Sequence, residues 1–326
     1  MRTSATNVRG LISIVGCGVS GLTTAIVLQR AGYRVRIHTR EMPADTTSAV
    51  AAAIWFPYKT GPLEAVNRWS RATYRVLETL SENPETGVKM VQFTEFVQSK
   101  ESAWWLDAIP EGRWRNATAA ELTDGQPMGF VMDVPMIETP IYLPYLLETF
   151  RQGGGEIQLG EIQNLADLRS ESPIVINCTG LGAKELANDP TLYPIRGQLV
   201  KIARQANIPF VSADSMDGAE LFEATYIFPR THDIVLGGTA VAGESSLEWD
   251  EDLGNRIIDR CRRLVPDIGE MEILDKVVGL RPGRATIRLE WDGEFVHNYG
   301  HGGAGYTVSW GCADAVLALV NGLELH

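Results

Sequence analysis

The chain has 326 residues, a formal net charge of −12 at pH 7 and 44% hydrophobic residues. This length suits one large domain or two interleaved domains, and the acidic balance argues against nucleic acid or an anionic membrane as a partner, because their phosphate groups would be repelled. No apolar run is long enough for a transmembrane helix, and neither a secretory signal nor a peroxisomal Ser-Lys-Leu address is present, which predicts a cytoplasmic protein.

The chain opens with a strand–turn–helix–strand unit. Residues 11–15 are predicted to form a buried strand, and residues 22–31 a helix that ends at Gly32. Residues 34–38 alternate apolar and polar side chains, as a second strand does. Between the first strand and the helix, residues 16–21 fit the pattern G-x-G-x-x-G, in the context that indicates a dinucleotide-binding turn.

Each glycine of this turn has a physical role. Gly16 permits the tight turn, Gly18 lets the backbone approach a pyrophosphate, and Gly21 lets the helix pack closely against the strand. The first turn of the helix then offers unpaired N–H groups and the positive end of its dipole to the phosphates. The motif predicts dinucleotide binding but does not distinguish FAD from NAD.

A carboxylate after the second strand is expected to bind the adenosine ribose. Glu41 lies at the expected spacing from Gly21, and the neighbouring Arg40 is the alternative. We favour Glu41 over Arg40 as the ribose contact.

The remaining elements suggest an interrupted nucleotide-binding domain. Residues 44–60 are predicted to be irregular with a short helix, and residues 90–132 to form short strands broken by Pro and Gly. Further helices are expected at 65–80, 142–152, 250–264 and 313–322, and strands at 156–159, 174–177 and within 198–239. This order predicts an α/β fold whose Rossmann-like domain is interleaved with a second domain built on a mostly antiparallel sheet.

The four cysteines give no sign of a metal site. They are not spaced as metal-binding pairs, and in a cytoplasmic protein the simplest interpretation is that they are small buried apolar residues.

Four motifs, in order, make the chain resemble the D-amino acid oxidase family of FAD-dependent enzymes over nearly its whole length. The first joins the glycine turn to residues 45–58, and the second is residues 175–182 with residues 194–198 downstream. The third is residues 226–230 with residues 237–239, and the fourth joins residues 279–290 to the glycine-rich segment 298–311. The family usually has a glycine where Ala53 stands, and its ribose-binding acid falls on Arg40, so that Glu41 would have to replace it.

The resemblance implies an FAD-binding domain made of residues 1–78, 140–192 and 279–326, and a substrate-binding domain made of residues 79–139 and 193–278. The FAD contacts that follow from the glycine turn and from the resemblance are Gly16, Gly18, Val19, Ser20, Gly21, Arg40, Glu41, Thr46, Thr47, Ser48, Ala52, Ala53, Ile54, Cys178, Thr179, Gly180, His301, Gly302, Gly303, Ala304, Gly305, Tyr306 and Thr307.

The same resemblance implies a reaction and its residues. The flavin takes a hydride from the Cα of a D-amino acid, and the products are a 2-oxo acid, ammonia and hydrogen peroxide. Arg281 is expected to bind the substrate carboxylate as a two-pronged anchor, Tyr226 to donate its hydroxyl to the same carboxylate, and the Gly303 carbonyl to accept from the amine. No side-chain general base is expected.

The substrate side chain is expected to meet Ile54, Phe56, Phe222 and Phe228. Three aromatic residues favour neutral or hydrophobic D-amino acids. Phe222 stands where mammalian members have a lid tyrosine, and the preceding segment is short, which suggests a reduced lid.

Two other functions remain open from the sequence. An oxidase for acidic D-amino acids, glycine or another amine is one, and Arg230 is the candidate for the second cation that an acidic substrate needs. A flavin- or NAD-binding protein without oxidase turnover is the other. The expected partners are a small-molecule substrate and oxygen, and the oligomeric state stays open, with a homodimer as one option.

Overall fold

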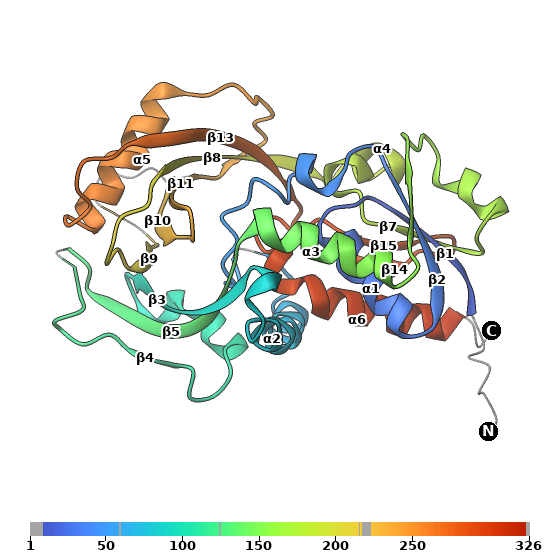
Figure 1. Ribbon diagram of the computed structural model, residues 1–326, viewed down its shortest axis with the longest axis horizontal. Coiled ribbons are helices and arrows are strands. Elements are labelled where there is room, and N and C mark those ends of the chain that lie inside the picture. Colours follow the sequence, from blue (N-terminus) through green and yellow to red (C-terminus); the bar gives the residue numbers. More distant parts are fainter. Residues whose placement is uncertain (1–8, 59, 124, 215, 217–222, 324–326) are drawn as a thin grey trace.

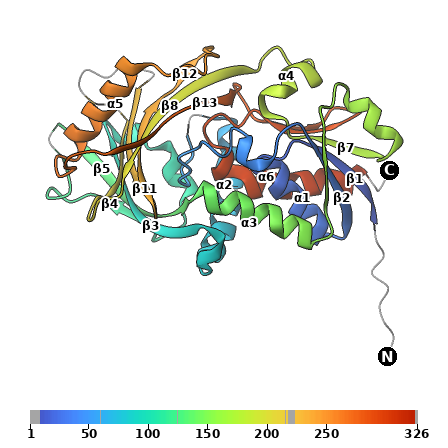
Figure 2. The same ribbon diagram turned by 45° about the horizontal axis from the view of Figure 1, so that its top comes forward.

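The computed structural model describes residues 9–58, 60–123, 125–214, 216 and 223–323. They form two β-sheets that lie next to each other, each with its own helices (Figure 1). Figure 2 shows two long strands, β8 (Tyr193–Ala203) and β13 (Ile273–Gly283), running from the larger sheet toward the smaller one. None of the described helices combines the length and apolarity that crossing a bilayer requires.

The smaller sheet has six strands in the order β14-β15-β7-β1-β2-β6. Its pairings are parallel except for the edge pair β14–β15. β1 lies in the interior, which is why Ile12 and Ile14 are both buried. The strands are β1 (Arg9–Val15), β2 (Tyr33–Thr39), β6 (Glu156–Leu159), β7 (Ile174–Asn177), β14 (Arg288–Trp291) and β15 (Val296–Tyr299).

Helices cover this sheet and connect its strands. α1 (Val19–Arg30) packs against α3 (Thr139–Gln152) and α6 (Gly305–Leu323), and Figures 1 and 2 show the three together on one side of the sheet. The short helix α4 (Ala183–Leu186) follows β7. Six 3-10 turns complete the connections: Pro43–Asp45, Pro84–Thr86, Lys100–Ser102, Trp104–Ala108, Leu165–Ser170 and Gly180–Gly182.

The larger sheet has nine strands in the order β12-β8-β11-β10-β9-β3-β5-β4, with β13 also paired to β8. Its pairings are antiparallel apart from β3–β9, which is parallel. The additional strands are β3 (Val88–Val97), β4 (Trp114–Asn116), β5 (Met128–Ile137), β9 (Phe210–Ala213), β10 (Glu223–Pro229), β11 (Asp233–Thr239) and β12 (Val241–Ala242).

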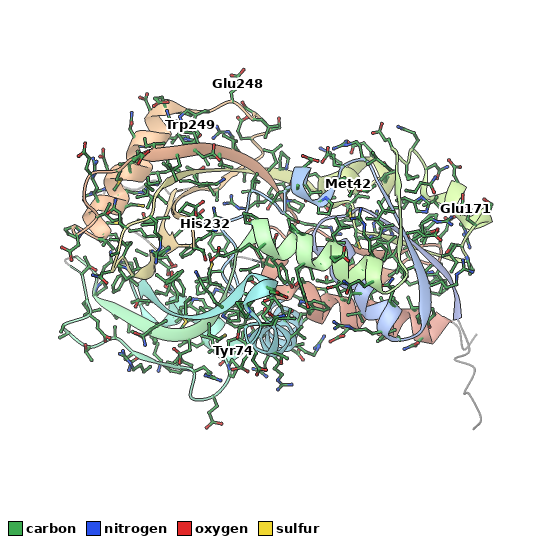
Figure 3. The ribbon with its side chains drawn as sticks, in the orientation of Figure 1. Met42, Tyr74, Glu171, His232, Glu248 and Trp249 are labelled. Carbon is green, nitrogen blue, oxygen red and sulfur yellow. The ribbon has the colours of Figure 1, made fainter. Side chains whose placement is uncertain are left out.

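α5 (Glu251–Leu264) covers the outer face of this larger sheet. Asp250 caps it, since its carboxylate accepts from the Leu253 N–H at 3.0 Å. The helix buries Ile257 and Cys261 against the strands beneath. Trp249 lies at its start in Figure 3 and packs on Gly254, where an added Cβ would be 2.3 Å from the indole.

α2 (Leu63–Leu80) joins the two parts. Tyr74 of this helix, labelled in Figure 3, donates its hydroxyl to the Asp133 carbonyl of β5 at 2.7 Å. On another face α2 crosses α6 so closely that a Cβ on Gly311 would be 2.3 Å from the Trp69 carbonyl oxygen. The small residue at 311 therefore sets the distance between the two helices.

The α/β fold with a parallel and a mostly antiparallel sheet is confirmed. The final helix was expected at 313–322 and begins at Gly305 instead. Residues 305–312 include glycines and β-branched residues, which have weak helix propensity, and burial of the segment overrides that weakness. The expected domain boundaries at 78/79 and 278/279 fall inside α2 and β13.

Candidate active site

A cavity of about 1160 Å³ lies between the two sheets. One side is lined by the loops after β1, β2, β6 and β7, at the carboxyl ends of parallel strands, and the other by β3, β10 and β13 of the larger sheet. Open parallel sheets bind their ligands at this edge. The volume slightly exceeds the 300–1,000 Å³ usual for a small-molecule pocket, which suits a dinucleotide together with a substrate.

The glycine turn forms the end of the cavity next to β1. Gly16 has a φ of 107°, and a Cβ there would be 2.5 Å from the Cys178 carbonyl oxygen. A Cβ on Gly21 would be 2.0 Å from the Gly16 carbonyl oxygen. Both added atoms would meet backbone, which does not yield easily, so the turn requires glycine at these two positions.

The segment after β2 is held against this turn. The Val19 N–H donates to Ser48 Oγ at 3.0 Å, and the Tyr306 hydroxyl donates to the Ser48 carbonyl at 2.7 Å. Thr46, Thr47 and Ser48 line the cavity together with Gly18. Hydroxyl groups and the start of α1 therefore face the same space, as a phosphate group would require.

A cation stands at the opposite, larger-sheet side. Arg281 of β13 lines the cavity, and its Nη1 donates to the Thr239 carbonyl at 2.9 Å. Its guanidinium covers Gly197 of β8, where an added Cβ would be 2.3 Å from Nη1. The Tyr226 side chain of β10 lies beside it and shares a hydrogen bond with it. Burial raises the pKa of Tyr226 despite the opposing effect of the Arg281 charge, so the hydroxyl remains a donor.

Comparison with known proteins identifies the family. The model of the family described as FAD dependent oxidoreductase matches residues 12–319. The chain belongs to this family. It is 42% identical to a D-amino-acid oxidase of Rubrobacter xylanophilus, with 94% of each chain covered, and 39% identical to a D-amino-acid oxidase of Streptomyces coelicolor, with 96% of this chain and 97% of that one covered. A crystal structure of glycine oxidase from Geobacillus kaustophilus shares the fold, with a TM-score of 0.79 at 19% identity over 96% of this chain and 95% of that one.

The protein is therefore an FAD-dependent oxidoreductase, and the cavity fits that cofactor. α1 has no acidic residue in its first turn, and its N-cap, Gly18, makes no side-chain cap hydrogen bond. The helix start would offer its dipole, and N–H groups other than that of Val19, to the pyrophosphate. Ala53 lines the cavity with a φ of 55°, a backbone conformation that favours glycine, the residue that the family resemblance led us to expect there.

Arg40 and Glu41 both line the cavity at the end of β2. Arg40 donates to Glu41 Oε1 through Nε at 3.0 Å and through Nη2 at 2.7 Å. Arg40 and Glu41, the two candidates for the ribose contact, are therefore paired with each other. Both hydrogen bonds go to Oε1 of Glu41, so Oε2 takes no part in this pair. We retain Glu41 as the proposed ribose contact, with Arg40 holding its carboxylate in place.

The loop before α6 is fixed by a buried polar chain. His301 Nε2 lies 3.0 Å from Asn298 Oδ1, and the Asn298 amide donates to Thr24 Oγ1 of α1 at 3.1 Å. Because Asn298 Oδ1 is an acceptor, Nε2 carries the histidine proton, and Nδ1 faces Ser20 Oγ at 3.4 Å. This chain ties the loop 301–305 to the start of α1, so that two helix N-termini border one cavity.

His301 makes the stability of the protein depend on pH. Burial lowers the pKa of His301 to about 4 from the ordinary value of 6.5, and burial also lowers the pKa values of His38 and His297. The unfolded chain therefore binds more protons between pH 6.5 and 4, so stability present above pH 6.5 is lost as the pH falls through this window. The His301 contribution is on the order of 3 kcal/mol.

We expect the thermal unfolding midpoint, followed by circular dichroism, to fall as the pH is lowered from 7 to 4.5. His301→Gln should flatten part of this dependence, because a neutral amide takes up no proton. The control is His232→Gln, since His232 (labelled in Figure 3) is an exposed histidine, and this variant should keep the wild-type dependence on pH. If the unfolding midpoint depends on pH equally in the wild type and both variants, His301 is not the source of this dependence.

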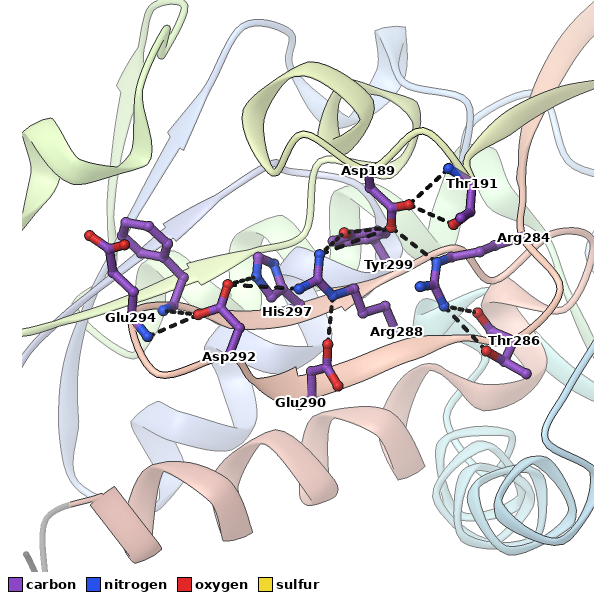
Figure 4. A network of polar contacts seen from close by, with 11 residues as sticks. Asp189, Thr191, Arg284, Thr286, Arg288, Glu290, Asp292, Glu294, His297 and Tyr299 are labelled. Atoms are coloured by element: carbon purple, nitrogen blue, oxygen red, sulfur yellow. Dashed lines mark hydrogen bonds and ion pairs between the residues drawn. The ribbon is translucent and has the colours of Figure 1, made fainter.

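A second polar network, drawn in Figure 4, supports the strand that leads into this loop. Buried Asp189 accepts from Arg284 Nε at 3.0 Å, from the Tyr299 hydroxyl at 2.9 Å and from Thr191. Burial acts to raise the pKa of Asp189, but the hydrogen bonds from Thr191, Tyr299 and Arg284 outweigh it and lower that pKa to about 2. Arg284 and Arg288 thus belong to this structural network, and neither lines the cavity.

The expected substrate pocket is largely assembled. Ile54, Phe56 and Phe228 line the cavity, and the ring of Phe228 stacks on that of Tyr226 at a centroid distance of 4.7 Å. Phe222, the fourth expected residue, lies outside the described part of the chain.

Three expected FAD contacts lie behind the cavity wall. Gly21 packs α1 on the turn, Ala304 is fully buried, and Thr307 bonds the Phe56 backbone at 3.1 Å and 2.9 Å. These three positions support the lining and do not form it, and their contact with FAD stays a prediction. The other expected contacts in the described part of the chain line the cavity: Gly16, Gly18, Val19, Ser20, Arg40, Glu41, Thr46, Thr47, Ser48, Ala52, Ala53, Ile54, Cys178, Thr179, Gly180, His301, Gly302, Gly303, Gly305 and Tyr306.

Sequence analysis missed several lining residues. Tyr58 packs on the loop 301–305, where a Cβ added to Gly303 would be 2.8 Å from the Tyr58 ring. Ile162 and Lys184 line the cavity from the connections after β6 and β7, which the rule that ligands bind at the carboxyl ends of parallel strands would have indicated. Phe93 and Glu95 come from β3, and no local motif marks them.

Proposed function

We propose that the protein catalyses the oxidative deamination of D-amino acids, giving 2-oxo acids, ammonia and hydrogen peroxide. The observation that carries this proposal is the guanidinium of Arg281, which lies beside Tyr226 in the wall of the FAD cavity. The resemblance to two bacterial D-amino-acid oxidases over nearly the whole chain supports it.

The protein binds and orients the substrate. Arg281 pairs with the carboxylate through charge-assisted hydrogen bonds, which fix its angle as well as its distance. Tyr226, which stays protonated, donates to the same carboxylate, and the Gly303 carbonyl accepts from the substrate amine. These contacts hold the Cα–H bond in one direction, which is the contribution of positioning to the rate.

FAD, when bound, supplies a two-electron acceptor for the Cα hydride and passes the electrons to oxygen to form hydrogen peroxide. The residues around it exclude water and hold the amine of the substrate against the loop 301–305. We propose no side-chain general base: the amine binds as, or becomes, the neutral form, and the resulting imine is hydrolysed by water.

Apolar walls support neutral or hydrophobic substrate side chains. Ile54, Phe56 and Phe228 line the substrate side of the cavity. We include Phe222 in the proposed pocket on the basis of the sequence alone.

The runner-up is an oxidase of D-aspartate, glycine or another amine. An acidic substrate needs a second cation, and Arg230 was the candidate. Arg230 is buried and gives both prongs of its guanidinium to Asp233, at 2.6 Å each, and it does not line the cavity. This pairing disfavours D-aspartate as the main substrate.

Other parts of the proposal concern organisation and location. We propose residues 1–78, 140–192 and 279–326 as the FAD-binding domain and residues 79–139 and 193–278 as the substrate-binding domain. A cytoplasmic location is supported by the four cysteines, all of them buried free thiols. We make no assignment of oligomeric state, and a homodimer stays open.

A peroxide-coupled screen of D- and L-amino acids with the purified protein tests the proposal. We expect peroxide from neutral D-amino acids and none from their L-enantiomers. D-aspartate turnover far above that of D-alanine and D-methionine supports the runner-up. A yellow protein that releases no peroxide is a flavoprotein without oxidase activity, and a protein without flavin absorbance contradicts the assignment.

A further inference from the structure

A buried carboxyl group faces the cavity from the larger sheet. Glu95 of β3 is 3% exposed and nevertheless lines the cavity. Phe93, two residues earlier on the same strand, lines it too, as the alternation of a strand requires. The roles given so far to the site residues do not involve Glu95.

The position of Glu95 is set by strand register. Glu95 of β3 pairs with Ser212 of β9, and Ser212 pairs with Tyr226 of β10. All three line the cavity, so one row across three neighbouring strands leads from Tyr226, which lies beside Arg281, to Glu95. At a spacing of about 4.8 Å between strands, this row separates Glu95 from Tyr226 by roughly 10 Å along the sheet.

The carboxyl of Glu95 contacts two polar side chains. The Ser212 hydroxyl donates to Glu95 Oε2, and the side chains of Glu95 and Asp214 are hydrogen-bonded to each other. Burial first, and then Asp214, raise the pKa of Glu95 well above its ordinary value. Among the described residues, no lysine, arginine or histidine forms an ion pair with Glu95. A cation brought next to this carboxyl would favour its ionised form and form an ion pair with it.

Aromatic rings lie beside this row, since Phe228 and Phe93 are each two residues away from Tyr226 and Glu95 along β10 and β3. The ring of Phe93 meets those of Phe56 and Phe228 edge to face, with centroid distances of 5.8 Å and 5.9 Å. Such walls suit the methylene stem of a long side chain, while its charged end needs a polar partner beyond them. Arg281 with Tyr226, the aromatic rings and the carboxyl of Glu95 thus line one cavity.

We propose that Glu95, with Asp214 beside it, is the specificity-determining end of the side-chain subsite, and that it selects D-amino acids whose side chains end in an amine or a guanidinium. This inference rests on the proposed oxidase function and refines its apolar preference. The aromatic rings contact the methylene stem of the substrate side chain, and the carboxyl of Glu95 binds the terminal cation. D-glutamate and D-aspartate are disfavoured as substrates, because their side-chain carboxyl group would lie beside those of Glu95 and Asp214.

The test compares D-lysine with D-norleucine, which has the same chain without the terminal amine. The specificity constant kcat/KM is measured by peroxide release with the FAD-loaded enzyme. Glu95→Gln should lower the value for D-lysine about 30-fold, the effect of losing a buried charge partner, and change that for D-norleucine less than about 3-fold. Turnover of D-glutamate should rise. The matched control is Glu111→Gln, an exposed glutamate that does not line the cavity, and it should leave all three values unchanged.

A merely structural role for Glu95 would affect both substrates equally. An unchanged D-lysine to D-norleucine ratio in Glu95→Gln therefore overturns the inference while leaving the oxidase proposal intact. If this variant does not fold or bind FAD, Asp214→Asn takes its place, and a ratio equal to that of the wild type then overturns it. If the wild-type protein oxidises no D-amino acid, both proposals fall.

Discussion

Arg281→Ala is expected to lower kcat/KM for D-amino acids by about 30-fold to several thousand-fold, because truncating one partner of a buried charge pair costs roughly 2–5 kcal/mol. Most of the loss should appear in KM, since the anchor acts on the bound substrate as well as on the transition state. The measurement is steady-state peroxide release, with flavin absorbance recorded on the same sample to show that FAD is retained.

Two further variants make the result specific. Gly197→Ala keeps Arg281 but puts a Cβ 2.3 Å from its Nη1, so the guanidinium must move and KM should rise as well. Arg262→Ala removes an exposed arginine of α5 and should change neither constant. If Arg281→Ala binds substrate as the wild type does, Arg281 is not the anchor and the proposed reaction loses its main support.

Gly21→Ala should abolish most FAD binding. The added Cβ would lie 2.0 Å from the Gly16 carbonyl oxygen, and neither backbone segment can yield without moving α1 away from the turn. Overpacking of this kind costs about 1–3 kcal/mol, which at its upper end weakens binding roughly 100-fold. The dissociation constant is measured by titrating the apoprotein with FAD and following flavin fluorescence.

Gly10→Ala is the control for this variant. Gly10 lies on β1, in the same strand–turn unit, and nothing lies within 4 Å of its added Cβ. It should bind FAD as the wild type does. A Gly21→Ala protein with unchanged affinity would show that the turn tolerates a displaced helix.

The FAD-binding glycine turn could be predicted almost entirely from the sequence, because its residues are adjacent along the chain. The glycine turn is a local pattern between a strand and a helix, and the cavity is found at that place. Gly21 illustrates this: the motif predicted that it lets the helix pack closely, and an added Cβ there would be 2.0 Å from the Gly16 carbonyl oxygen.

The substrate side was harder, because strand register places its residues. Tyr226 and Arg281 were found only through a family resemblance, and Glu95 was missed. Its position in β3 reads as an ordinary charged residue on a strand, which would be expected to face solvent. Only the pairing of β3 with β9 places Glu95 in the row that contains Tyr226.

The interleaving of the two sheets has a consequence for synthesis on the ribosome. β7 gains its neighbour β15 only when residues 296–299 have emerged, and β8 gains β13 only when residues 273–283 have emerged. Each sheet of the nascent polypeptide therefore keeps an open edge until translation is nearly finished. Such edges pair readily with other chains, so the nascent polypeptide is open to wrong strand pairing from the emergence of β7 until that of β15.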